Sequence, residues 1–432
     1  MKVYSVVKDS EIEWMGTIPE HWEVKKLKLL GEAITGLTYS PNDVVNKGEG
    51  ILVLRASNIQ NNQIKFENNV YVDTQIPFKL ITRKNDILIC SRNGSRKLIG
   101  KAALIDNQSE GISFGAFTTV FRSDLSEYLF YVFLSPIFEF QIGTFLTSTI
   151  NQLTIGNLNS LQIPVPSKRE QKSIVNYLKV KTKEIDLLLN QKQLLISLLE
   201  QQRQSIITEA VTKGLNPNVK MKDSGVEWIG EIPEHWDVNK IKFKFDIRKF
   251  IQPSENPTVL SLTQRGLKIK DLKDFSGQHA ESYDKYQKVE FKDYVMNGMD
   301  LLTGYVDCSP FEGVTSPDYR VFRIKDNTEC HDYYLRYFQM CYFTKIFYGH
   351  GQGVSNFGRW RLQTDVFKEF PIPVPPKNEQ FEVSKYLKTK ESEIDKSLEL
   401  IKLDIEKLKE YRQALIYEAV TGKIDVRDME LD

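Results

Sequence analysis

The stretch between Lys79 and Lys101 concentrates side chains that can bind a polyanion. It carries seven basic residues against one acid, Asp86, which gives a local charge of +6. Within it, residues 91–97 form the loop Ser-Arg-Asn-Gly-Ser-Arg-Lys after a predicted strand. Lysine and arginine neutralise phosphate, arginine also matches the acceptor edge of guanine, and asparagine matches adenine. The composition of this loop therefore predicts contacts to nucleic acid.

A second loop with related chemistry lies in the C-terminal half. Residues 349–361 combine glycines with amide, hydroxyl and arginine side chains and contain no acid, and their counterpart, residues 147–152, is polar and uncharged. A polar or charged run is most often a solvated loop, and that interpretation stays open for each residue taken alone. Such loops at matching positions in two halves of one chain favour an interface with nucleic acid.

The side chains that we expect to contact DNA are basic, amide, hydroxyl and aromatic groups from both halves. No residue is assigned a catalytic role or a metal ion. The expected DNA contacts are Arg55, Asn58, Arg83, Lys84, Arg92, Asn93, Ser95, Arg96, Lys97, Gln152, Arg265, Lys268, Tyr305, Gln352, Ser355, Asn356, Arg359 and Arg361.

The overall charge does not make this a basic protein, because 58 lysines and arginines face 57 acids and the net charge is +1. Nucleic-acid binding then requires positive charge that is local, as in the stretch above. The apolar content of 41% and the charged content of 27% are ordinary for a soluble globular protein. A length of 432 residues predicts two or three domains.

We expect a cytoplasmic protein without a metal site. No run of eighteen apolar residues is present, and the first residues, Met-Lys-Val-Tyr-Ser, have no apolar segment typical of a signal peptide. The four cysteines are too scattered for the ligand spacing of a zinc knuckle or for a disulfide framework. We therefore expect free thiols.

The elements that must position the loops occur twice in the chain. The segment Asp9–Trp22 recurs as Asp223–Trp236 at an offset of 214 residues. A second block, which starts with Ile-Pro-Val-Pro at Ile163 and ends at Thr212, recurs from Ile372 to Thr421 at an offset of 209 residues. A duplicated architecture is therefore expected.

Between the repeated blocks a common skeleton remains visible. Val120–Arg122 matches Val321–Arg323 at an offset of 201, and Asp86–Leu88 matches Asp300–Leu302 at an offset of 214. Insertions and deletions of this size belong in surface loops. The apolar runs predict strands near residues 51–54, 86–90 and 117–121, and one aromatic-rich helix is expected near residues 128–140 and again near 333–347. Each middle segment is therefore a small α+β domain.

Each Ile-Pro-Val-Pro segment is followed by more than 40 residues without proline or glycine, up to Ala210 and Ala419. Apolar residues recur there every seven positions in two rows, which predicts a long coiled-coil helix. About 42 residues rise by roughly 60 Å. The two helices are natural partners, and an antiparallel pairing would relate the halves by a pseudo-two-fold axis. The residues expected to pack are Leu178, Ile185, Leu189, Ile196, Leu199, Ile206, Leu387, Ile394, Leu398, Ile405, Leu408 and Leu415.

The predicted fold class is therefore α+β, with two globular α/β domains separated by two long helices that form an antiparallel coiled coil. The expected boundaries place the first globular domain at residues 1–162 and its helix at 163–215. The second globular domain is expected at residues 216–371 and its helix at 372–432. One body duplicated with different loops suggests one task performed on two targets. Duplex DNA suits this design, since two domains held about 34 Å apart address successive major grooves.

The sequence resembles the specificity subunit of type I restriction–modification enzymes. The resemblance rests on residues 227–236, Glu-Trp-Ile-Gly-Glu-Ile-Pro-Glu-His-Trp, and on residues 371–380, Pro-Ile-Pro-Val-Pro-Pro-Lys-Asn-Glu-Gln, each present twice, and it covers essentially the whole chain. It implies two target-recognition domains that each bind half of a bipartite, asymmetric DNA site, with the helices as spacer and docking surface. Residues 208–215 lie where the first helix of this family leads into the second domain.

The resemblance also implies partners and cofactors. Two modification subunits would bind S-adenosylmethionine and methylate adenine, and restriction subunits would translocate and cut DNA with ATP and Mg²⁺. No cofactor is expected in this chain. The resemblance does not transfer the DNA sequence that is recognised.

Two other classes of function stay open from the residues alone. A self-contained DNA-modifying enzyme would need a cofactor or metal site. The stretch Gly94–Ala102 is one residue too long for a phosphate-binding loop, Pro317-Asp318 lacks a second carboxylate, and Asn256-Pro257 continues with Thr-Val rather than with proline and an aromatic residue. His21 and His235 repeat within Pro-Glu-His-Trp and fit a structural role where globular domain and helix join. A coiled-coil scaffold that binds no DNA is the other alternative, and the divergent basic loops disfavour it.

Overall fold

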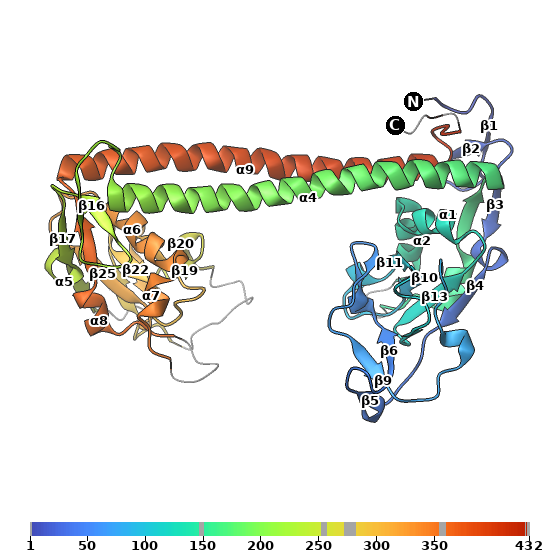
Figure 1. The fold of residues 1–432 in the computed structure, drawn as a ribbon, viewed down its shortest axis with the longest axis horizontal. Helices are drawn as coiled ribbons and strands as arrows, with labels where there is room; N and C mark the ends of the chain where they lie inside the picture. Colours follow the sequence, from blue (N-terminus) through green and yellow to red (C-terminus); the bar gives the residue numbers. More distant parts are fainter. Residues whose placement is uncertain are drawn as a thin grey trace. The chain divides into compact units, whose positions relative to one another are not determined.

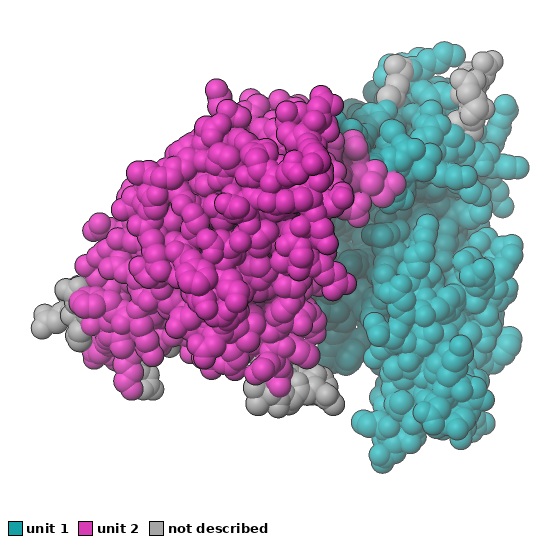
Figure 2. Space-filling view, turned by 60° about the vertical axis from the view of Figure 1, so that its left-hand side comes forward, with its two compact units in different colours: residues 1–192, 402–432 teal, residues 193–401 magenta. Residues whose placement is uncertain are grey.

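The computed structural model describes residues 2–146, 151–251, 257–271, 282–353, 360–427 and 429. The chain divides into two compact units, one formed by residues 1–192 with 402–432 and the other by residues 193–401 (Figure 2). Each unit contains one globular part and a portion of both long helices. We call the globular part of the first unit head 1 (residues 2–165) and that of the second unit head 2 (residues 216–374).

The two long helices predicted from the heptad pattern are present. Helix α4 spans Lys168–Lys213, 46 residues, and helix α9 spans Lys377–Val420, 44 residues (Figure 1). Helix α4 begins at a capping box, because the Ser167 N–H donates to the Glu170 carboxylate at 3.2 Å and the Glu170 N–H donates to the Ser167 hydroxyl at 3.4 Å. The first proline of each Ile-Pro-Val-Pro segment, Pro164 or Pro373, lies in a strand that pairs with a single partner, and the second proline follows the end of that strand.

The apolar rows face inward as predicted, because all twelve residues assigned to them are buried or half-buried. Polar residues that interrupt the rows are paired across the helices. In the first unit Lys192 lies 2.7 Å from Asp404, and Arg412 lies 3.0 Å from Asp186. Since the lower number on α4 meets the higher number on α9, the two helices run antiparallel there. The packing of the first unit is that of an antiparallel coiled coil.

Head 1 is built on a four-stranded antiparallel sheet of order β11-β10-β13-β4. Its central strand, β10, is buried at every position. A second four-stranded sheet has the order β12-β6-β9-β5 and includes the parallel pair β6 and β12. The elements of head 1 are β1 (Val7–Asp9), β2 (Thr17–Pro19), β3 (Glu23–Lys26), β4 (Glu32–Thr35), β5 (Val44–Val45), β6 (Ile51–Leu54), β7 (Ile59–Gln60), β8 (Gln63–Ile64), β9 (Val70–Val72), β10 (Ile87–Cys90), β11 (Ala102–Leu104), β12 (Ser113–Phe114), β13 (Thr118–Arg122), α1 (Ser126–Phe133), α2 (Pro136–Phe145), α3 (Ile155–Ser160) and β14 (Gln162–Val165).

Head 2 repeats the main sheet with the order β23-β22-β25-β18. The predicted α+β class is therefore confirmed in both halves of the chain. The elements of head 2 are β15 (Met221–Asp223), β16 (Glu231–Pro233), β17 (Asp237–Lys240), α5 (Ile241–Lys244), β18 (Phe245–Arg248), β19 (Leu260–Thr263), β20 (Gly266–Ile269), β21 (Gln287–Val289), β22 (Tyr294–Met296), β23 (Val306–Cys308), β24 (Gly313–Thr315), β25 (Arg320–Ile324), α6 (His331–Phe343), α7 (Ile346–Gly349), α8 (Thr364–Glu369) and β26 (Pro371–Val374).

The prediction of a single aromatic-rich helix in each half is wrong, because each half has two consecutive helices separated by a break. In head 1 the break falls between α1 and α2, where Pro136 starts the second helix and cannot donate the hydrogen bond that would continue the first. In head 2 the break between α6 and α7 falls at Lys345, whose φ of 61° is left-handed. In each head, both pieces of the broken helix contribute aromatic side chains to the hydrophobic core.

The predicted match of Asp86 with Asp300 is also wrong. Strand register pairs Ile87 with Phe121 in head 1 and Tyr294 with Phe322 in head 2, so the residue equivalent to Asp86 is Asp293. The two aspartates perform the same task. Each is buried and lies within 3 Å of an arginine on the neighbouring strand, at 2.6 Å for Asp86 and 2.7 Å for Asp293. Asp300 instead accepts hydrogen bonds in an exposed turn.

No single helix in the described part of the chain is both long and apolar enough to cross a membrane. The bent pair α1 and α2, which meet at 68°, passes a joint test of length and composition. Both helices contribute buried residues to the core of head 1.

Candidate nucleic-acid interface

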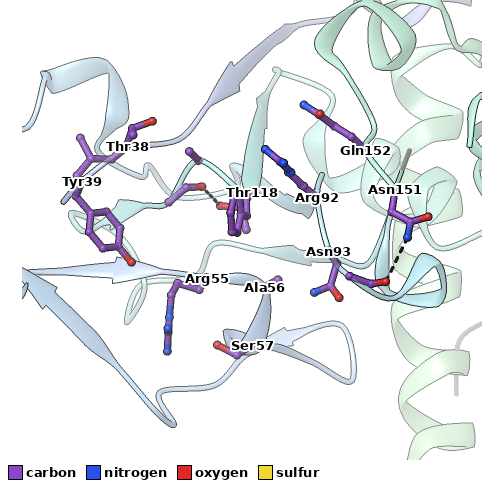
Figure 3. Close-up of a pocket in the computed structure, with 15 residues that line it drawn as sticks. Thr38, Tyr39, Arg55, Ala56, Ser57, Arg92, Asn93, Thr118, Asn151 and Gln152 are labelled. Atoms are coloured by element: carbon purple, nitrogen blue, oxygen red, sulfur yellow. Dashed lines mark hydrogen bonds between the residues drawn. The ribbon is translucent and has the colours of Figure 1, made fainter. Parts of the chain in front are cut away.

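A cavity of about 910 Å³ opens in head 1 and is lined by several of the predicted contact residues. It collects segments next to the ends of separate strands: residues 37–39 after β4, 55–57 after β6, 92–94 after β10 and 115–118 at the start of β13, together with Asn151 and Gln152. Figure 3 shows Arg92 and Gln152 next to each other on one side, and Tyr39 and Arg55 on the other. The lining includes two arginines and no carboxylate among the described residues.

The backbone of Arg92 is fixed on two sides. Its N–H donates to the carbonyl of Phe117 at 3.0 Å, and an antiparallel bridge joins it to Gln152. The guanidinium carbon lies 5.3 Å from the centre of the Phe117 ring, which is 59% exposed. A cation held against an aromatic face keeps its charge at the surface without a neutralising acid.

Asn93 and Asn151 shape the loop that follows. The Asn93 side-chain oxygen accepts from the Ser95 N–H at 2.9 Å, and the Asn151 amide donates to the Gly94 carbonyl at 3.2 Å (Figure 3). Asn93 therefore helps to position the loop. Because an amide oxygen can accept two hydrogen bonds, the contact of Asn93 with adenine stays a prediction.

Arg55 lies in the cavity wall, and its neighbour Asn58 does not. The Arg55 side chain donates to the Asn68 carbonyl at 2.6 Å, and its Nε is buried without a partner among the described residues. Asn58 is fully buried and its amide donates to the carbonyls of Lys65 and Glu67. The prediction of a DNA contact by Asn58 is wrong for this reason, since no part of its side chain faces solvent.

The one acid of the basic stretch, Asp86, points into head 1. It is 2% exposed, and Arg122 donates to it through Nε at 2.8 Å and through Nη2 at 2.6 Å. These hydrogen bonds raise the pKa of Arg122. Because Asp86 is neutralised internally, the positive charge of the stretch around it is left at the surface.

The remaining predicted contacts of head 1 are exposed but lie outside the cavity. Arg83 and Lys84 line a separate hollow, where the Arg83 guanidinium carbon lies 5.4 Å from the centre of the Phe78 ring. Arg96 donates to the Gly143 carbonyl at 3.1 Å, and Ser95 and Lys97 flank it. These residues extend the basic surface of head 1.

Head 2 places its predicted contacts on two segments. Arg265 and Lys268 are exposed on the hairpin β19–β20. Gln352 and Arg361 exchange backbone hydrogen bonds of 2.9 and 3.0 Å, and Arg361 lines a hollow of about 130 Å³. Ser355, Asn356 and Arg359 lie outside the described residues. Tyr305 is half-buried, and burial raises its pKa.

The hollow beside Arg361 collects further cations that the sequence did not single out: Arg248, Lys249 and Arg320, with Asp318 as an acid in the lining. Burial lowers the pKa of Arg320 to about 10, and its guanidinium carbon lies 4.6 Å from the centre of the Phe367 ring. Arg320 donates to the Leu362 carbonyl at 2.8 Å, so it supports the wall of this hollow.

The duplicated Pro-Glu-His-Trp segments bind the start of each long helix through a glutamate. In the first unit Glu170 accepts from His21 at 2.8 Å and from Trp22 at 3.3 Å. In the second unit Glu379 accepts from His235 at 2.7 Å and from the indole of the following tryptophan at 2.8 Å. The predicted structural role of the two histidines is confirmed. The two glutamates were not singled out from the sequence, although Glu379 lies in the repeated segment 371–380.

A buried tyrosine in each head holds the end of the other half's long helix. The Tyr128 hydroxyl donates to the Pro164 carbonyl at 2.7 Å and lies 3.1 Å from the Val420 carbonyl of α9. The Tyr333 hydroxyl lies 2.8 Å from the Val211 carbonyl of α4. Burial raises the pKa of both tyrosines well above the usual value. From the sequence, these two tyrosines were predicted only as part of the aromatic-rich helices, although they occupy matching places in the two halves.

No group of three or more histidine, cysteine, aspartate or glutamate side chains in the described part of the chain could hold a metal ion. All four cysteines are free, and three of them are buried.

Comparison with known proteins gives one consistent result. The profile of the type I restriction modification DNA specificity domain matches residues 19–197 and 239–409. A Methanocaldococcus jannaschii protein, provisionally named the type I restriction enzyme MjaX specificity subunit, is 26% identical over 96% of this chain and 96% of its own length. The EcoKI specificity subunit of Escherichia coli K12 is 26% identical over 53% of this chain and 49% of its own length.

Solved structures show the same fold at low sequence identity. A chain from a study of complex assembly and conformational transition in a type I R-M system has a TM-score of 0.69 at 14% identity, covering 94% of this chain and 99% of that one. The HsdS subunit of Thermoanaerobacter tengcongensis has a TM-score of 0.50 at 15% identity, covering 94% of this chain and 98% of that one.

Proposed function

The chain belongs to the type I restriction–modification DNA specificity family, and from this premise we propose that it recognises a bipartite, asymmetric DNA site for a type I restriction–modification complex. One observation carries the proposal. The two heads keep the same sheet order and the same buried Asp–Arg pair, and they present different polar loops at the strand ends. Two unlike interfaces on one scaffold would bind two unlike half-sites.

In this proposal the chain selects DNA and its partners perform the chemistry. Two modification subunits bind S-adenosylmethionine and methylate adenine, and restriction subunits use ATP and Mg²⁺ to translocate and cut DNA. The complex acts in the cytoplasm. The polar and basic loop residues of the two heads supply phosphate and base contacts, while the long helices hold the spacing between half-sites.

The exposed leucines of α4 support docking of a modification subunit on the helices. Leu194 and Leu198, one helical turn apart, are 61% and 50% exposed. In the first unit Leu187 is 58% exposed on the same helix. Leucines exposed to this degree on a helix whose other face is packed fit an apolar partner surface. Replacing Leu194 and Leu198 by glutamate should abolish co-purification with the modification subunit, whereas Gln193→Glu, on the same helix, should not.

Methylation by the reconstituted complex tests the proposed function. The chain purified with its modification subunit should methylate adenine within a split site, and the chain alone should methylate nothing. Methyl transfer by the isolated chain would show a self-contained enzyme instead. Failure of the complex to bind or methylate any DNA, with the coiled coil intact, would favour a scaffold.

A further inference from the structure

We propose that Arg92 and Gln152 are the base-recognising pair of head 1, with Arg92 selecting guanine and Gln152 selecting adenine in the neighbouring base pair. This inference rests on the proposed function and gives it a chemical preference. It arises from the way in which the fold places these two side chains together at the cavity (Figure 3).

The bridge between the two residues sets their spacing. Arg92 and Gln152 are direct antiparallel partners, and the adjacent Leu153 N–H donates to the Ser91 carbonyl at 2.8 Å. Direct partners in an antiparallel pair point to the same face, with Cβ atoms about 4.5–5.5 Å apart. Successive bases along one strand are separated by about 3.4 Å. Two long side chains that start at this spacing can reach neighbouring base pairs.

The Arg92 guanidinium is oriented in advance by Phe117. Its carbon lies 5.3 Å from the ring centre, and the ring itself is 59% exposed. An aromatic face holds the planar guanidinium and leaves its N–H groups directed outward, which reduces the entropy lost when two hydrogen bonds form at once. Guanine offers two acceptors, O6 and N7, in the geometry that arginine matches.

Within the described part of the chain, the hydrogen-bonding atoms of both recognition groups are available to a ligand. Both side chains are exposed, and among the described residues neither has a hydrogen-bond or ion-pair partner. Arg55, across the cavity, differs because it donates to the Asn68 carbonyl. The described lining contains no carboxylate that could compete with a base for Arg92. The Gln152 amide places an N–H donor beside a carbonyl acceptor, the pattern that matches N7 and the amino group of adenine.

Mapping of methylated adenines at base resolution tests this proposal in the complex of the full chain with its modification subunits. The half-site bound by head 1 should contain a guanine next to an adenine. Arg92→Ala should make the guanine position degenerate, with a roughly 5- to 150-fold loss of discrimination, since a bidentate contact distinguishes bases by about 1–3 kcal/mol. Gln152→Ala should relax only the adjacent adenine position.

A gain of specificity separates base recognition from damage to the fold. Gln152→Glu should change the preferred base from adenine to cytosine, because a carboxylate accepts from the cytosine amino group. Arg92→Lys should retain part of the guanine preference. Lys97→Ala, an exposed cation on the same loop and outside the cavity, is the control and should weaken binding to all sequences without changing the motif.

Several results would overturn the inference without touching the proposed function. A split motif with no guanine–adenine neighbours in either half would contradict it. Uniform weakening by Arg92→Ala with an unchanged motif would show a phosphate contact instead. If the Arg92 and Gln152 variants changed base preference only in the half-site bound by head 2, these residues would not be the base-recognising pair of head 1. If the wild-type complex methylates no split site at all, the proposed function itself fails.

Discussion

The two heads share an internal framework and differ where that framework ends. Both keep the buried aspartate paired with an arginine on the adjacent strand, and both keep the tyrosine that holds a helix end. The turn before the aspartate then diverges. Head 1 carries Arg83, whose N–H donates to Asp86, and head 2 carries Glu290, whose N–H donates to Asp293.

This single exchange reverses the local charge. Arg83 is exposed beside Phe78 and adds to the basic surface of head 1. Glu290 lies 2.7 Å from Arg248 and 3.0 Å from Arg323, so it neutralises cations in head 2. In both heads the hydrogen bond from the backbone N–H to the aspartate holds the turn in place. The side chain at the first position of the turn can therefore differ and change the charge of the surface. Surfaces can therefore diverge without loss of the scaffold.

The largest expected effect comes from breaking the shared framework. Asp86→Ala and Asp293→Ala should each destabilise their head by about 3–5 kcal/mol, because each removes a buried carboxylate that binds both an arginine on the neighbouring strand and the backbone of the turn. Asp300→Ala should cost about 1 kcal/mol, since that residue caps an exposed turn. Denaturant unfolding of the full chain measures the three variants. Equal losses for Asp293→Ala and Asp300→Ala would contradict the assignment of Asp293 as the equivalent of Asp86.

A smaller effect is expected where the heads meet the helices, and here the two copies should differ. Glu170 is 4% exposed and accepts from Tyr4, His21, Trp22 and Ser167, whereas the Glu379 side chain is 30% exposed. Glu170→Ala should cost about 3 kcal/mol and Glu379→Ala about 1.5 kcal/mol, because more buried donors lose their acceptor in the first case.

The same denaturant measurement compares the two glutamates, with the glutamine variant at each position as the control that keeps an acceptor. A larger loss for Glu379→Ala than for Glu170→Ala would contradict the view that buried donors decide the difference.

The shared framework could be predicted well from the sequence because the segments that form it occur twice in the chain. The heptad rows, the duplicated histidines and the strands predicted near residues 51–54 and 86–90 all carry periodic or repeated signals. The cavity carries no such signal, since it joins segments that are far apart in the sequence, from Leu37 to Gln152, through strand pairing that only the folded chain sets. Asn58 shows the same limit, because a polar residue type alone does not tell a buried turn from a binding surface.

Because Glu290 replaces Arg83 at this turn, we expect the contribution of this position to stability to depend on pH in head 2 only. Hydrogen bonds from Arg248 and Lys288 lower the pKa of Glu290 from 4.5 to about 2. A carboxyl group with a lowered folded-state pKa contributes stability that is complete above its unfolded value and is lost as the pH falls through the folded value. The advantage of wild type over Glu290→Gln should therefore shrink between about pH 4.5 and pH 2.

Unfolding of both proteins across that pH range measures this difference. Arg83→Gln, at the equivalent place in head 1, is the matched control and should show no such dependence. A wild-type advantage that stays constant down to pH 2 would mean that the ion pairs of Glu290 do not contribute.

Exchange of one head tests whether each head recognises its own half-site. Residues 23–162 are replaced by the corresponding segment of another family member, and the methylated motif of the reconstituted complex is mapped. One half of the motif should change while the other half and the spacing between them stay the same, because the second head and both helices are untouched. A change in both halves would contradict the view that two separate heads each recognise their own half-site.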